Sequence, residues 1–229
     1  MTMDQNNDLN VARQGFEISL NKLQSDILLL GDLVIQAINK SINSLKTRNI
    51  EQSQEVIKDD DSIDELETQI QVLCVELIRK EAPLASDLRR IVSALQIVDE
   101  LERIGDYAEG IAKISVTMGK LVPINELVLI PKMAENSVSM LSRSLESYTL
   151  RDFSLCSSIL EELRTKDKEI NSMHKQVQKE LLNTIKSDSS EGGEQATYLM
   201  WAAHNLERIA DRSKNIAERS LFQVTGEIN

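Results

Sequence analysis

Apolar residues recur every three or four positions along most of the chain, which is the period of an amphipathic α-helix. The clearest series runs from Phe16 to Leu45 in steps of 4-3-4-3-4-3-4-4 and predicts one long helix, followed by a turn at 47–49. A second series runs from Ile63 to Leu77. Because proline cannot join an internal helical hydrogen bond and disfavours a helical residue before it, the second helix must end before Pro83.

A third helix is predicted to begin near Ala85 and to fade at Gly119. The segment 119–131 holds two of the three prolines and is expected to join two units. Three more helical patterns follow, with SDSSEGG (187–193) as the clearest loop between the last two. Their expected ranges are 131–148, 152–187 and 191–222.

The chain also repeats itself. LERIGD at 101–106 recurs as LERIAD at 206–211, an offset of 105 residues. This offset predicts an all-α fold of two tandem three-helix bundles, a pseudo-twofold internal repeat with units at 10–118 and 124–222. One six-helix array without duplication is the alternative.

Composition supports long helices and narrows the function. Only 3% of the 229 residues are aromatic, and Gly (8) and Pro (3) are scarce, so few residues favour turns. The formal charge of −11 argues against nucleic acid as a direct partner. With no apolar leader and no run of about eighteen apolar residues, we expect a soluble cytoplasmic protein without membrane insertion. Cys74 and Cys156 would then remain reduced.

Acidic residues follow the same helical spacing on two neighbouring helices. The third helix carries acids in steps of 3, 4 and 3, and the second carries acids in steps of 4 and 3. Neighbours three and four apart share one helix face. The two stripes are Asp99, Glu102, Asp106 and Glu109 on the third helix, and Asp60, Asp64 and Glu67 on the second.

Counting outwards from Pro83 places these acids in facing layers of an antiparallel hairpin: Glu67 with Asp99, Asp64 with Glu102, and Asp60 with Asp106. The same count about Ser189 pairs His174 with His204, Asn171 with Glu207, and Asp167 with Asp211. The chain has only two histidines, and both fall in one layer. Neither pair of facing stripes is expected to contain lysine or arginine.

Two carboxylates about 4 Å apart repel by roughly 4 kcal/mol at an effective dielectric near 20, so stacked layers require protonation, ion pairing or a bound cation. Ion pairing is one interpretation, because Arg103 and Arg208 can reach Asp106 and Asp211 three positions along. A metal site is the other. Oxygen ligands with one imidazole layer favour Mg, Mn, Fe or Ca.

Three stretches resemble the PhoU family of phosphate-transport accessory and regulatory proteins: EAPLASDLRRI (81–91), LERIGDYAEGIA (101–112) and HNLERIADRSKNIAER (204–219). The resemblance implies two three-helix bundles, a cytoplasmic homodimer, and peripheral association with a phosphate ABC transporter. It also implies multinuclear metal, iron foremost or else Zn, Mg or Mn, with motif ligands at Glu102, Asp106, Glu207 and Asp211. The expected companions are Asp60, Asp64, Glu67, Asp99 and Asp167, and the layer count adds His174 and His204.

The function that the resemblance implies is a non-enzymatic, metal-binding adaptor. It would contact the transporter ATPase and a phosphate-sensing histidine kinase, and repress the phosphate-starvation response when phosphate is plentiful. A helical scaffold without metal is one alternative. A carboxylate-bridged metal oxidase is another, but it calls for Glu-x-x-His, and Asn171 and Trp201 precede the two histidines by three positions.

Overall fold

The computed structural model describes residues 3–119, 128–187 and 191–227, which form six α-helices and no strand. The first three helices follow the predicted seams and turns closely. The helices are α1 (Met3–Thr47), α2 (Ile50–Glu81), α3 (Ala85–Met118), α4 (Leu129–Leu150), α5 (Phe153–Ser187) and α6 (Glu191–Thr225). The predicted all-α fold of two three-helix units is confirmed. The unit bounds 10–118 and 124–222 remain a prediction.

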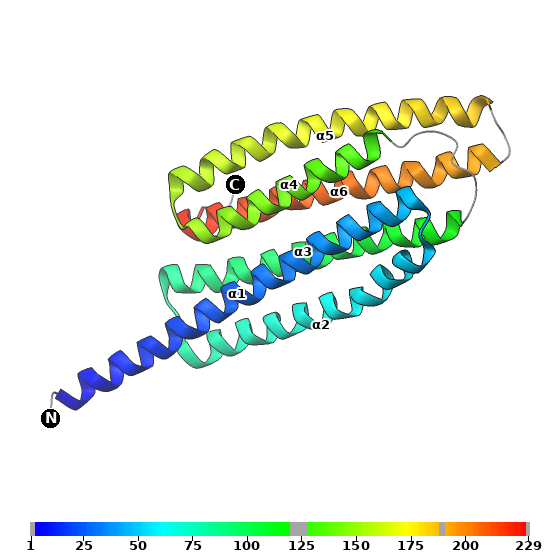
Figure 1. Cartoon of the computed structure of the whole chain (residues 1–229). Coiled ribbons are helices and arrows are strands. Elements are labelled where there is room, and N and C mark those ends of the chain that lie inside the picture. Colours follow the sequence, from blue (N-terminus) through cyan, green and yellow to red (C-terminus); the bar gives the residue numbers. More distant parts are fainter. Residues whose placement is uncertain (1–2, 120–127, 188–190, 228–229) are drawn as a thin grey trace.

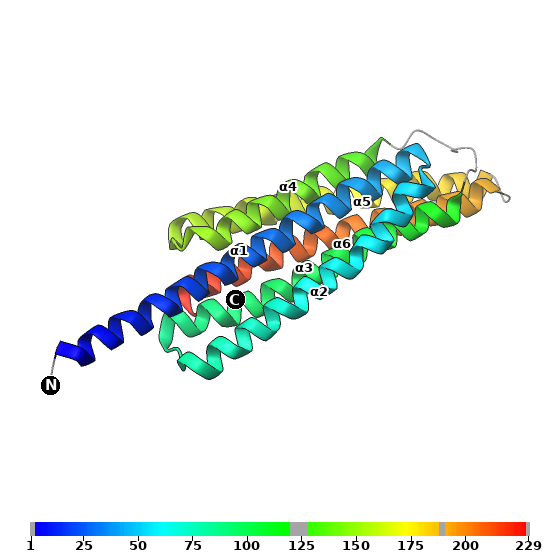
Figure 2. The same ribbon diagram turned by 60° about the horizontal axis from the view of Figure 1, so that its bottom comes forward.

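The two bundles lie side by side, with α1–α3 in one and α4–α6 in the other (Figure 1). Within each bundle consecutive helices run in opposite directions, and the bundles meet where α3 packs on α6 and α1 on α4. The rotated view in Figure 2 shows the first part of α1 extending beyond the other helices. None of the helices in the described ranges is long and apolar enough to cross a lipid bilayer.

The apolar seams form the core. Leu20, Ile27 and Leu30 of α1 are at most 2% exposed, so the predicted series does face the interior. Gly31 lowers the helix propensity of α1, but a Cβ there would lie 2.5 Å from Cδ1 of Leu145 on α4. The glycine therefore permits the close packing of α1 on α4 that joins the two bundles.

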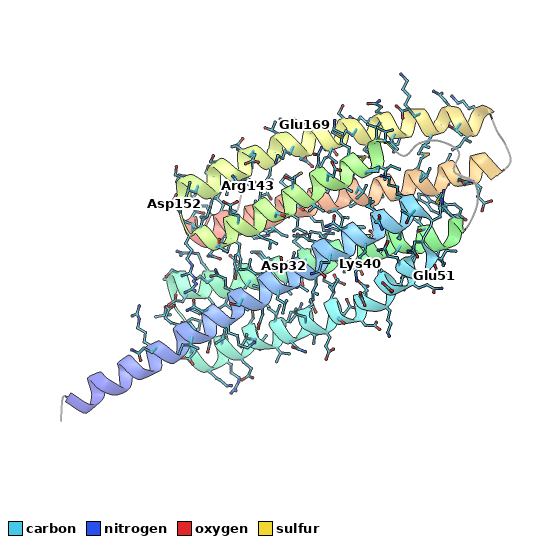
Figure 3. The ribbon with its side chains drawn as sticks, viewed as in Figure 1. Asp32, Lys40, Glu51, Arg143, Asp152 and Glu169 are labelled. Atoms are coloured by element: carbon cyan, nitrogen blue, oxygen red, sulfur yellow. The ribbon has the colours of Figure 1, made fainter. Side chains whose placement is uncertain are left out.

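Side-chain caps define two of the turns. Asn49 Oδ1 accepts a hydrogen bond from the Gln52 backbone N–H at 3.0 Å at the start of α2. Asp152 Oδ1 accepts from the Leu155 N–H at 2.9 Å at the start of α5. Figure 3 labels charged residues along the helices, among which Asp152, Asp32 and Glu169 are exposed.

Two predicted connections are shorter than expected. Helix α4 begins at Leu129, so Pro131 lies in its first turn, where the missing N–H has no helical partner to lose. Helix α6 begins at Glu191, as the predicted range 191–222 has it, so Gly192 and Gly193 are helical and the predicted loop 187–193 was too long. The remaining parts of these connections, 120–127 and 188–190, lie outside the described residues.

Candidate metal centre

The acidic stripes of α2 and α3 face each other because the two helices approach closely at Gly105. A Cβ at this position would lie 3.2 Å from Cγ2 of Ile63 and 3.5 Å from Oδ1 of Asp60. The second repeat has Ala210 at the equivalent position. The Asp60 carboxylate is therefore held against the α3 backbone beside the LERIGD motif.

The charges of the two stripes act on one another across the hairpin. The pKa of Asp60 is raised to about 7, first by burial and then by the charges of Glu109, Asp64 and Asp106, which together outweigh the lowering by Lys113. Burial also raises the pKa of Glu102, as do the charges of Asp106, Asp64 and Glu67. Carboxylates on the two helices thus disfavour one another's ionised forms.

Gln71 joins the two acids of the layer nearest Pro83, Glu67 and Asp99. Its amide donates to Oδ1 of Asp99 at 3.0 Å and also to Glu67. Burial raises the pKa of Glu67, and the charge of Asp99 adds to the effect. All three predicted layers of the first repeat therefore bring acids together across the hairpin.

Cations lie beside this acidic face. Arg103 contacts Asp106 at 3.1 Å and Glu102 at 3.5 Å, as the spacing predicted for Asp106, and Lys113 pairs with Glu109. In the part of the chain that the structure describes, no ion pair reaches Asp60, Asp64 or Glu67. These three acids are left for another cation to neutralise.

No three His, Cys, Asp or Glu side chains within the described residues converge tightly enough to form a ready-made ion site. The donor set of the first repeat nevertheless fits a hard cation, because several carboxylates share one face and raise one another's pKa. The carboxylates that would hold such a cation are Asp60, Asp64, Glu67, Asp99, Glu102 and Asp106.

The second repeat differs at a position that the sequence reasoning missed. Lys214 Nζ lies 3.1 Å from Oδ2 of Asp167 and 2.9 Å from Oδ1 of Asp211. Arg208 also pairs with Asp211, at 2.9 Å. The expectation that the facing stripes contain no lysine was therefore wrong for this repeat, because Lys214 lies three positions after Asp211 on the same helix face.

The 105-residue offset identifies the origin of this difference. It aligns Lys214 with Glu109, so the second repeat has a base where the first has an acid. A protein cation already neutralises the layer formed by Asp167 and Asp211.

The two histidines meet as predicted. The rings of His174 and His204 have centroids 6.0 Å apart, and Nδ1 of His204 lies 3.6 Å from a Glu207 oxygen. Burial lowers the pKa of His174, which outweighs the opposing charge of Glu207. Nε2 of His174 is buried without a hydrogen-bond partner. A neutral imidazole with a free nitrogen can act as a metal ligand.

A polar network joins α3 to α6 between the bundles. Glu100 accepts from Arg212 at 2.7 Å and from Asn215 at 3.1 Å, and Asn205 Nδ2 donates to the Tyr107 carbonyl at 3.4 Å. Beside this network, a cleft of about 640 Å³ extends from the acidic face to α6. Hydrophobic periodicity did not indicate these residues, because they meet only when the bundles dock.

Comparison with known proteins agrees with this arrangement. The family model described as "PhoU domain" matches the chain twice, over residues 27–115 and 130–220. The chain belongs to the PhoU family. Each match falls within one of the two bundles, so the repeat is a tandem pair of PhoU domains.

Relatives within the PhoU family align over nearly their full length. A "Phosphate-specific transport system accessory protein PhoU homolog" from Aquifex aeolicus is 34% identical over 209 residues, covering 91% of this chain and 92% of the relative. A protein of the same name from Clostridium acetobutylicum is 30% identical over 217 residues, covering 94% of this chain and 97% of the relative.

Solved PhoU structures share the fold. The crystal structure of PhoU from Pseudomonas aeruginosa superposes with a TM-score of 0.85 at 29% identity, covering 93% of this chain and all of that one. The phosphate transport system regulatory protein PhoU from Streptococcus pneumoniae gives 0.83 at 29% identity, covering 93% and 99%. The relatives' sequences and the solved structures thus agree with membership of the PhoU family.

The raised pKa of Asp60 predicts a pH-dependent stability for this PhoU-family protein when it is metal-free. An acid whose folded-state pKa exceeds its unfolded value contributes stability that is fully present below the unfolded value of 3.8 and is lost as pH rises towards about 7. In chelator, the melting temperature should therefore fall as pH rises from about 4 to about 7. Asp60→Asn should raise it at pH 8 and flatten its pH dependence.

Glu55→Gln is the matched control. Glu55 is exposed on the same helix, and its substitution removes the same charge from the chain. Equal pH dependence in the Asp60 and Glu55 variants would show that Asp60 is not held against the other acids.

Proposed function

We propose that this PhoU-family protein is a non-enzymatic, metal-binding adaptor that represses the phosphate-starvation response when phosphate is plentiful. Its partners would be the ATPase of a phosphate ABC transporter and a phosphate-sensing histidine kinase, in the cytoplasm and as a homodimer. Its relatives are named as accessory proteins of phosphate-specific transport, which supports a role for this protein in phosphate uptake.

The observation that carries the metal proposal is the acidic face of the first repeat. Asp60, Asp64 and Glu67 face acids of α3 across the hairpin, and no ion pair of the described residues neutralises them. A divalent or multinuclear metal, iron foremost or else Zn, Mg or Mn, would relieve their mutual repulsion. It would also reduce the negative charge of a surface that partners approach, which changes the partners it accepts.

The second repeat is proposed as a weaker site. Lys214 competes with a metal for Asp167 and Asp211, while His174, His204 and Glu207 form a separate layer with neutral His174. Metal binding there would require either displacement of Lys214 or coordination through the histidine layer alone.

Deletion of the gene tests the regulatory role. A phosphate-starvation reporter should switch on in high-phosphate medium in the deletion strain and be silenced again by the wild-type gene. A reporter that stays silent in the deletion strain would refute the repressor role. Complementation with the Glu102→Ala, Asp106→Ala double variant then tests the metal: it should fail, whereas Glu55→Gln should complement.

A further inference from the structure

The cleft between the repeats has two sides of opposite charge. Its mainly acidic side belongs to α2 and α3 and includes Asp64, Glu67 and Glu102 with Arg103 beside them, whereas α6 contributes Arg212 and Arg219. We propose that this cleft binds inorganic phosphate between the α6 arginines and a divalent cation on the acidic side. This inference rests on the metal site proposed above and adds phosphate as the anion bound next to the metal.

Unsatisfied polar atoms indicate that the cleft is built for a ligand. Nε of Arg219, Nε of Arg212 and Oε1 of Gln96 are all buried without a hydrogen-bond partner, and all three residues line the cleft. Leaving buried donors and acceptors unpaired is costly. In the ranges that the structure describes, no ion pair involves Arg219, whereas Arg212 binds Glu100 and also hydrogen-bonds to Tyr107.

The unpaired atoms match the chemistry of hydrogen phosphate. A guanidinium donates several N–H groups in a planar fork that fits a tetrahedral oxyanion. Hydrogen phosphate also carries an O–H, which can donate to Oε1 of Gln96. Sulfate has no such donor at neutral pH, so the Gln96 acceptor favours phosphate over sulfate.

The charge of the cleft couples the anion to a cation. Acids outnumber arginines five to three among its lining residues, so free phosphate is repelled. One divalent cation on the acidic side cancels this excess of two negative charges and so removes the repulsion. By linkage, phosphate must then strengthen cation binding by the same factor by which the cation strengthens phosphate binding.

The second repeat lacks this combination. Shifting by 105 residues replaces Arg219 with Ile114, Arg212 with Tyr107 and Gln96 with Trp201. Ile114 is apolar and packs against the core, and Trp201 is exposed and stacks edge-on against Tyr198. The geometry therefore assigns phosphate to the first-repeat cleft alone.

Equilibrium dialysis of the full chain with radiolabelled phosphate, with and without Mn²⁺, tests the proposal. Phosphate should bind only with Mn²⁺ and more tightly than sulfate. Arg219→Gln should weaken phosphate binding about tenfold or more, the loss expected for one charged hydrogen bond, without weakening Mn²⁺ binding in the absence of phosphate. Arg164→Gln is the matched control, because Arg164 pairs with Glu161 on α5, outside the cleft.

A second variant, Gln96→Leu, should remove the preference for phosphate over sulfate, and thermal unfolding checks that both variants fold. Mn²⁺ binding without phosphate binding would overturn this inference and leave the metal proposal standing. Unchanged phosphate affinity in Arg219→Gln would also overturn it. Failure of Mn²⁺ to bind, with the same failure for iron, Zn²⁺ and Mg²⁺, would refute the metal proposal and this inference together.

Discussion

Replacing Glu102 and Asp106 with alanine should abolish the stabilisation of this protein by Mn²⁺ while leaving its helices formed. At a free concentration about one hundred times the dissociation constant, a ligand of the native state adds about 2.7 kcal/mol to the free energy of unfolding. Both side chains lie on the acidic face, at 25% and 41% exposure, and not in the apolar seam. Without metal, the double variant should be more stable than the wild type, because the substitutions remove negative charges that lie near the carboxylates of Asp60 and Asp64.

The matched control is Glu51→Ala with Glu55→Ala, a pair of exposed glutamates with the same four-residue spacing on α2. This control should keep the full response to Mn²⁺ in thermal unfolding. Equal stabilisation of the control and of the Glu102, Asp106 variant by Mn²⁺ would show that the first-repeat acidic face does not bind the metal.

Lys214→Met should destabilise the protein by about 1–3 kcal/mol, because it removes the cation that bridges two partly buried carboxylates and leaves Arg208 paired with Asp211 alone. The side chains of Lys214 and Asp167 are only 20% and 15% exposed, so water compensates little. Methionine keeps the aliphatic packing and removes only the charge. Chemical denaturation at pH 7 measures the loss, which Mn²⁺ should partly restore by binding Asp167 and Asp211.

Lys175→Met on α5 is the control, since Lys175 is exposed, and it should change the free energy of unfolding by less than about 0.5 kcal/mol. To isolate the second repeat, the Mn²⁺ response should be measured with Glu102→Ala and Asp106→Ala also present. A Lys214 variant that is as stable as the wild type, or that gains no response to Mn²⁺, would contradict the role of Lys214 as the resident cation of the second repeat.

Much of this fold follows from sequence because helix period and short turns are local properties. The seam from Phe16 to Leu45 fixes which face of α1 is buried, and Pro83 fixes where α2 ends. The short turn between α2 and α3 also fixes the register of the hairpin. Counting from Pro83 therefore brought Asp60 to the part of α3 that carries Gly105, Asp106 and Glu109.

The residues that the sequence did not predict are basic, and a search for acidic stripes does not find them. Lys214 shares a face with Asp211, and the repeat offset aligns it with Glu109, so the comparison of repeats contained the signal. The α6 side of the cleft had no such signal. Arg212 and Arg219 meet the α3 acids only through docking of the two bundles, which helical periodicity does not encode.

The most direct test of the metal-binding account is elemental analysis of protein purified without an affinity tag and dialysed in the presence of iron or Mn²⁺. We expect at least one metal ion per chain in the wild type and in the Glu51, Glu55 control, with most of it lost in the Glu102→Ala, Asp106→Ala variant. A wild-type protein that retains no metal, or a double variant that retains as much as the wild type, would contradict the assignment of the metal site to the acidic face of α2 and α3.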